Sequence, residues 1–199
     1  MNTIKITAKD LDSSKYYKED GIGHIGADFE GNVEIAENLG TVQFRKGVYV
    51  TGYILAGAGS GIKTDGGITA GDGGITAGWS ITAGWSITAG DGITADYGGI
   101  TAGRGITAGD GITAGDGITA GYGIECKGEL SFNYKLFAGT APWTDSADKY
   151  VRCGKLVKGT IAYGDLEETG MEDDKVEIKV EGKTIMISRE SAKALNLID

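Results

Sequence analysis

Residues 61–128 read GIKTDGGITAGDGGITAGWSITAGWSITAGDGITADYGGITAGRGITAGDGITAGDGITAGYGIECKG, and within them a six-residue unit, essentially GITAGD, is repeated about ten times. The isoleucines of the unit recur every six residues, with two steps of seven, at Ile62, Ile68, Ile75, Ile81, Ile87, Ile93, Ile100, Ile106, Ile112, Ile118 and Ile124. A fixed short period is typical of a solenoid, in which each unit buries its apolar side only against the next unit.

Each unit predicts a strand of two or three residues followed by a corner. On an extended backbone, the Ile and Ala of the Ile-Thr-Ala triplet point to one side and the Thr points to the other. A helix is excluded because each glycine would destabilise it by about 1 kcal/mol. Gly-Asp-Gly favours a turn, since glycine adopts positive φ without strain. We therefore expect an aliphatic interior and a hydroxyl-bearing surface.

The variable residue four places after each isoleucine indicates how many units form one coil. Read at every third unit, these residues separate into columns, whereas reading at every second unit mixes aspartates with aromatics. The columns are Asp72, Asp91 and Asp110; Trp79, Tyr97 and Asp116; and Trp85, Arg104 and Tyr122. The sequence therefore predicts an all-β fold, a three-sided β-solenoid with coils about 4.8 Å apart.

Two of the columns suggest interactions along an edge. A guanidinium between two aromatic rings, as in the third column, would gain about 0.5–1 kcal/mol at an exposed site. The aspartates of the first column either accept backbone N–H bonds in their own turns or form a cation-binding edge together. The sequence leaves both interpretations open.

The rest of the chain is predicted to form attachments to the solenoid. We expect an N-terminal cap over residues 1–32, the solenoid over 33–137, an irregular capping loop and acidic linker over 138–175, and a β-hairpin with a short helix over 176–199. Within 138–175, Val151 to Ile161 is a candidate for one more strand pair. The hairpin is predicted from apolar alternation around Glu181-Gly182, and the helix from Ser188 as its N-cap. This last piece is too small to be stable alone. It should dock on the solenoid or on a second copy, which would form a homodimer.

Composition restricts the class of partner and the compartment. The net charge of −9 and the pI of about 4.7 argue against direct nucleic-acid binding and favour a basic protein partner. The first ten residues lack the apolar core of a signal peptide, and no run approaches 18 apolar residues. We therefore expect a cytoplasmic protein without a membrane partner, in the host cytoplasm if it is phage-encoded.

Cys126 and Cys153 are either small packing residues or a disulfide, and no zinc site is predicted.

Over roughly Val33 to Leu136, the period and the inward aliphatic residue resemble the hexapeptide-repeat left-handed β-helix, known best from acyltransferases of sugars and serine. That family has a small residue two places before the aliphatic one, where this chain has residues such as Trp79 and Arg104. The resemblance therefore implies the solenoid, but not its handedness. An acyltransferase would also need a trimer, acyl-coenzyme A between the coils and a catalytic histidine.

Catalytic groups are scarce in this sequence. The single histidine, His24, lies in GIGHIGAD before the regular repeats, and this segment lacks the spacing and the helix of a dinucleotide fingerprint. No Ser/His/Asp set or phosphate loop can be named, so we predict no enzyme and no cofactor. Ice binding is disfavoured because each strand offers one outward threonine rather than Thr-x-Thr.

The sequence favours a non-enzymatic acidic binding protein. Its expected partner-binding residues are the corner aromatics with one arginine, and the carboxylates of the acidic linker: Trp79, Trp85, Tyr97, Arg104, Tyr122, Glu167, Glu168, Glu172, Asp173 and Asp174. Exposed Trp and Tyr are typical anchors, and a negative surface complements a positive groove, although the aromatics could instead stack to stabilise the corners. A phage-type inhibitor of a nucleic-acid-handling host defence protein, such as a CRISPR effector, fits this pattern. A self-associating rod or phage fibre component is the alternative.

Overall fold

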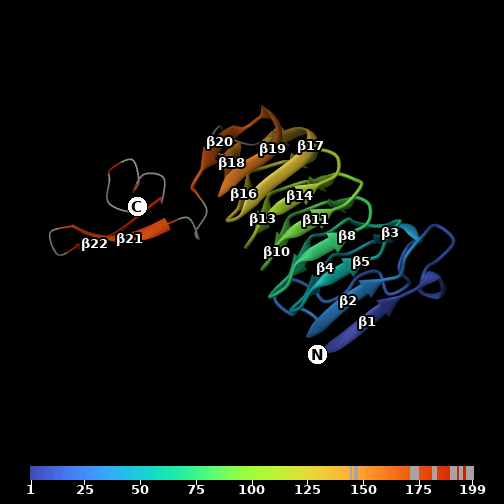
Figure 1. Ribbon diagram of the computed structural model, residues 1–199. Helices are drawn as coiled ribbons and strands as arrows, with labels where there is room; N and C mark the ends of the chain where they lie inside the picture. Colours follow the sequence, from blue (N-terminus) through green and yellow to red (C-terminus); the bar gives the residue numbers. More distant parts are fainter. Residues whose placement is uncertain are drawn as a thin grey trace.

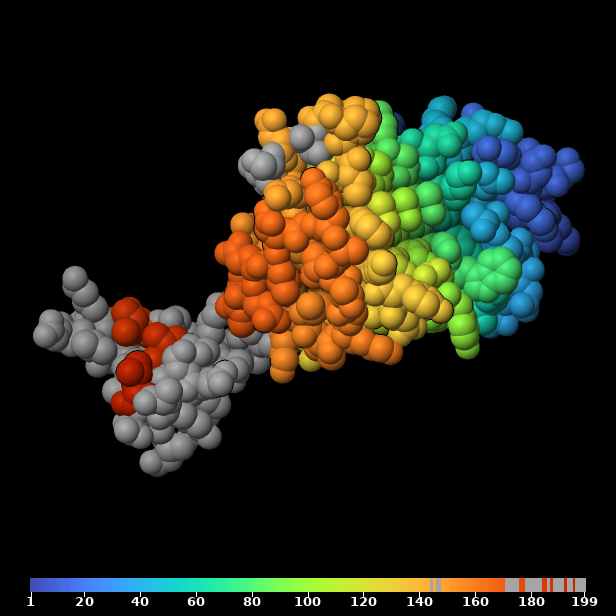
Figure 2. Space-filling model, turned by 90° about the horizontal axis from the view of Figure 1, so that it is seen from above, coloured from blue at the N-terminus to red at the C-terminus, as the bar shows by residue number. Residues whose placement is uncertain are grey.

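The computed structural model describes residues 1–143, 145, 148–170, 175–180, 183–188, 192 and 195. The chain is all-β and winds as a parallel β-solenoid of about seven turns (Figure 1). In Figure 2 the colours pass from blue to orange along the stack, so the coils follow one another in chain order. The predicted solenoid is confirmed.

Three rows of parallel strands form the three faces of the solenoid, as predicted. Face A contains β1 (Asn2–Ile6), β2 (Gly31–Ile35), β5 (Ile54–Ala56), β8 (Ile75–Ala77), β11 (Ile93–Ala95) and β14 (Ile112–Ala114). Face B contains β3 (Gly40–Phe44), β6 (Ser60–Thr64), β9 (Ile81–Ala83), β12 (Ile100–Ala102) and β15 (Ile118–Ala120). Face C contains β4 (Val48–Val50), β7 (Ile68–Ala70), β10 (Ile87–Ala89), β13 (Ile106–Ala108), β16 (Ile124–Cys126), β18 (Tyr150–Cys153) and β20 (Asp165–Glu168).

One long strand joins faces A and B at the C-terminal end of the stack. In β17 (Glu129–Ala138), Leu130 pairs with Ile112 on face A, and Leu136 pairs with Ile118 on face B. Strand β19 (Lys155–Tyr163) pairs in parallel with both the face A part and the face B part of β17. Faces A and B are therefore connected here through the backbone.

The strand register aligns identical residue types of neighbouring coils. Ile93 lies between Ile75 and Ile112, and the threonines and alanines of the same strands align in the same way. The isoleucines of the repeat have no exposed surface, and burying each one stabilises the fold by about 1.5–3 kcal/mol. Each face carries a single outward threonine column in the regular repeats, such as Thr82, Thr101 and Thr119 on face B.

The glycines of the repeat have a different role from the one predicted. No glycine between residues 61 and 128 has positive φ, so turn conformation does not require them. They allow neighbouring coils to approach at the corners: a Cβ at Gly109 would lie 1.7 Å from the carbonyl oxygen of Gly90. The physical requirement is close backbone packing.

The N-terminal segment covers the first coil on all three sides. Strand β1 pairs with β2 on face A, Tyr16 bridges to Gln43 on face B, and Ile22 bridges to Val48 on face C. Between them lies a short 3-10 helix, η1 (Ala8–Asp10). Its side chains Ile6, Leu11 and Ile22 are buried in the core, and the segment therefore blocks the strand edges of the first complete coil.

The C-terminal part extends the solenoid further than the sequence indicated. Strands β18 and β19 fall on the candidate strand pair over Val151 to Ile161, whereas β20 lies where we expected an acidic linker. They lack the Ile-Thr-Ala pattern, but the backbones of β18 and β19 pair with the open edges of β16 and β17, and β20 pairs with β18. Cys126 and Cys153 are buried free thiols on neighbouring strands β16 and β18, so they are packing residues and not a disulfide.

The expected hairpin is present as an antiparallel sheet of its own, formed by β21 (Lys175–Val180) and β22 (Lys183–Ser188). The predicted C-terminal helix falls mostly on residues outside the described part of the chain. Within the described part, no helix is long and apolar enough to cross a membrane.

Candidate docking surface

The corners between faces collect the residues selected from the sequence. Corner AB, between faces A and B, carries Trp79 after β8, Tyr97 after β11 and Asp116 after β14. Corner BC carries Trp85 after β9, Arg104 after β12 and Tyr122 after β15. Corner CA carries Asp72, Asp91 and Asp110. The strand register thus places the residues of each predicted column at one corner, and the two aromatic corners border the same face, face B.

Corner BC is a continuous ridge of rings with one cation. The guanidinium carbon of Arg104 lies 5.1 Å from the centre of the Trp85 ring, within cation–π range. The backbone N–H of Tyr122 donates to the carbonyl of Arg104 (3.3 Å). Among the described residues, Arg104 has no carboxylate partner. Its charge therefore stays available to a ligand.

Trp143 extends this ridge and was missed by the sequence analysis. It is 72% exposed, and its indole N–H donates to the hydroxyl of Tyr122 (3.1 Å). It lies between β17 and β18, so it occupies corner BC one coil beyond Tyr122. A tryptophan beside the chain's only proline was a signal of a structured loop, but its position depends on where β17 ends.

A loop of the N-terminal cap enlarges the same corner. Ile25 is 65% exposed, and two open hollows of about 300 Å³ and about 460 Å³ share Ile25, Tyr49 and Trp85 in their linings. Arg104 and Asp28 line the smaller hollow. Arg45, Lys46 and Asp65 line the larger hollow. The Trp85 end of corner BC is thus an apolar surface with three cations and two carboxylates at its border.

Corner AB is also aromatic. Tyr97 is 80% exposed, and Trp79 is about half exposed. Tyr134, in the middle of β17, extends this corner beyond Asp116 and is 67% exposed. Rings exposed to this degree contribute little to the buried core.

Two of the predicted acidic residues, Glu167 and Glu168, do not join this surface. Glu167 accepts a hydrogen bond from the Arg152 guanidinium (2.9 Å), and Glu168 accepts one from the backbone N–H of Leu156 (2.6 Å). Both lie on β20 in the last coil and hold its strands together. Glu172, Asp173 and Asp174 lie outside the described residues.

Corner CA keeps its aspartates exposed. Among the described residues, Asp72, Asp91 and Asp110 accept no side-chain hydrogen bond, because corner N–H groups donate to the adjacent coil, as from Asp91 to Gly73 (3.3 Å). The interpretation that each aspartate accepts N–H bonds in its own turn is therefore wrong. No group of three or more potential metal-ligating side chains occurs in the described part of the chain.

No known family model, curated protein or solved structure matches this chain.

His24 lies on the cap, where its Nδ1 is 3.3 Å from the carbonyl oxygen of Ile25. Within the described residues, its ring makes no hydrogen bond to a hydroxyl or carboxylate. The side chain lines the larger hollow near Trp85. Among the described residues, this arrangement does not pair the His24 ring with a nucleophile.

Proposed function

We propose that this protein is a non-enzymatic binding protein that docks on a basic partner through corners AB and BC. The supporting observation is that exposed aromatic side chains gather on two neighbouring corners that border one face. Rings of this kind dominate binding energy at protein interfaces. A rigid solenoid presents them without an ordering cost, which favours affinity.

Charge favours the basic character of the partner. Residues 61–128 carry seven acidic and three basic side chains, and the whole chain has a net charge of −9. Such a surface accelerates encounter with a positive groove and disfavours nucleic acid itself. A nucleic-acid-handling protein, such as a CRISPR effector, has this kind of groove. Occupying it would make the chain an inhibitor.

The test is affinity capture followed by binding measurements on the purified partner. Replacing Trp79, Trp85 and Tyr97 together by Ala should weaken binding by at least about 30-fold, the effect of losing one strong anchor, while the far-UV circular dichroism stays unchanged. Tyr53→Ala is the matched control, because Tyr53 is an exposed aromatic at corner CA. Equal affinities for the triple variant and the parent would remove the aromatic corners from the proposal.

Self-association is a second candidate, favoured by the last coil. Strands β19 and β20 each pair on one side only within the described residues, and Val157, Tyr163 and Leu166 are exposed there. An open strand edge of this kind can recruit another chain. Light scattering separates the candidates: a filament or trimer without a partner supports a structural rod, whereas a monomer or dimer that binds a basic protein supports docking.

A further inference from the structure

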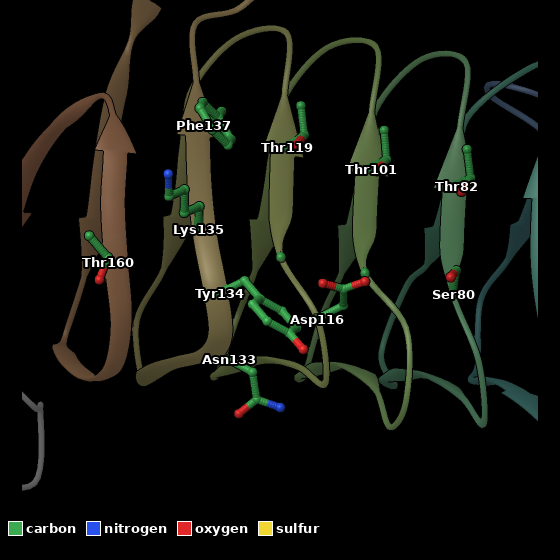
Figure 3. A pocket seen from close by; sticks show the side chains of 12 residues that line it. Ser80, Thr82, Thr101, Asp116, Thr119, Asn133, Tyr134, Lys135, Phe137 and Thr160 are labelled. Atoms are coloured by element: carbon green, nitrogen blue, oxygen red, sulfur yellow. The ribbon is translucent and has the colours of Figure 1, made fainter.

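Face B carries a shallow groove between the two docking corners, and it shares Asp116 and Tyr134 with corner AB. The groove encloses about 700 Å³ and crosses five strands, from Thr82 on β9 to Thr160 on β19 (Figure 3). At a strand spacing of about 4.8 Å, five strands span about 19 Å along the solenoid axis. The groove is thus long enough for an extended chain.

The floor of the groove is a row of free hydroxyls. Thr82, Thr101 and Thr119 stack in register, and Figure 3 shows them side by side on successive strands. None of the three donates or accepts a side-chain hydrogen bond among the described residues. In contrast, the buried hydroxyl of Thr64, one coil earlier on the same face, donates to the carbonyl of Gly66 (2.8 Å). The row is therefore available to a ligand.

Aromatic rings lie beside this row. Tyr134 and Phe137 both come from β17, and both are exposed. In Figure 3 the Tyr134 ring lies next to Asp116, and Phe137 lies level with the threonines. Rings next to hydroxyls give a ligand an apolar contact and hydrogen bonds at once.

The charges in the groove balance. Asp116 and Lys135 both line it, and neither forms an ion pair with a described residue. One carboxylate and one ammonium leave no net charge, in contrast to the acidic surface elsewhere. The groove therefore favours a neutral ligand and not the basic partner of the corners.

We propose that the face B groove binds a neutral oligosaccharide that extends along the solenoid axis. A sugar hydroxyl both donates and accepts hydrogen bonds, as a threonine hydroxyl does. Each sugar ring also has an apolar C–H face that can pack on Tyr134 or Phe137. A glycan repeats both features along its length, as the groove does, whereas a peptide backbone offers no repeated apolar face.

The test uses NMR titration of the full chain with three neutral hexasaccharides: β-1,4-linked glucose, α-1,4-linked glucose and β-1,4-linked N-acetylglucosamine. At least one should shift the amide signals of Thr82, Thr101 and Thr119. Replacing Thr101 and Thr119 by Val removes two hydroxyls and keeps the β-branched shape, and should weaken binding by about tenfold. The matched control, Thr88→Val with Thr107→Val on face C, should leave affinity unchanged.

Three results would overturn the proposal: no shift with any hexasaccharide at millimolar concentration, equal weakening in the face C control, or equal shifts with a neutral Ser-Gly hexapeptide. The variant that lacks Trp79, Trp85 and Tyr97 should still bind the glycan, because none of the three lines the groove. Failure of this proposal is therefore distinguishable from failure of docking.

Discussion

Replacing Gly109 by Ala should strongly destabilise the solenoid, although the glycine has ordinary φ. A Cβ at this position would lie 1.7 Å from the carbonyl oxygen of Gly90 in the preceding coil. Because Cβ atoms do not approach other heavy atoms within 3.0 Å, the two coils would have to separate by 1.3 Å (3.0 − 1.7) at this corner.

The magnitude follows from the hydrogen bonds that this separation would break. The N–H of Gly109 donates to Ala89 (3.0 Å), and the N–H of Asp110 donates to Asp91 (3.4 Å). Moving the coils apart by more than 1 Å takes both contacts beyond bonding distance. Two backbone groups left unpaired at about 1–3 kcal/mol each lower the free energy of unfolding by about 2–6 kcal/mol.

The matched control is Gly105→Ala, at a corner of the same repeat. A Cβ there would meet only the carbonyl oxygen of Gly123, at 3.3 Å, so the free energy of unfolding should change by less than about 1 kcal/mol. Urea unfolding followed by far-UV circular dichroism measures both variants. Equal stability of the two variants would refute the claim that inter-coil contact, and not turn conformation, selects glycine here.

Three further outcomes are expected. Ile100→Ala should lower the free energy of unfolding by about 2–5 kcal/mol, measured by urea unfolding, because Ile100 is fully buried between Ile81 and Ile118; a cost below about 1 kcal/mol would contradict the stacked core. Burial raises the pKa of Cys126 to about 12 and that of Cys153 to about 11, so both thiols should resist iodoacetamide in the folded chain at pH 8 and react in urea. Since the unfolded chain loses these protons from about pH 9 and the folded chain retains them, stability should fall as pH rises from about 9 toward 12, and less so in a Cys126→Ala, Cys153→Ala variant. Asp91→Asn should raise the melting temperature at roughly 0.01 M salt and not at roughly 1 M, where screening removes repulsion from Asp72 and Asp110; an equal rise at both salt concentrations would show that charge is not the cause.

The sequence was sufficient for the three-sided fold and for the corner columns. A strict period with one variable place lets three strands per coil be inferred, because every third variable residue falls into a column such as Asp72, Asp91 and Asp110. The fold beyond Leu136 could not be inferred in this way, because β19 and β20 pair through their backbones and have no repeated side-chain pattern.

The candidate surfaces were only partly predictable. Tyr134 lies four places after Leu130, as the corner residues do after the isoleucines, but Trp143 reaches corner BC through the loop between β17 and β18, which no spacing rule indicates. Glu167 and Glu168 were selected for their charge, but their position on β20 assigns them structural contacts. The groove depends on which threonine column faces Tyr134 and Phe137, and all three columns look alike in the sequence.

The identical stacking of the coils has a consequence for how such a gene can change. Excising residues 93–111 would join Gly92 to Ile112, and the strands on either side would meet in the same register that Ile75, Ile93 and Ile112 now share. Recombination between repeats could therefore shorten or lengthen the solenoid by one coil, and the remaining strands would still pair in register. Each such event would remove or add one variable side chain at every corner. The number of corner side chains offered to a ligand would therefore change, whereas the fold would not.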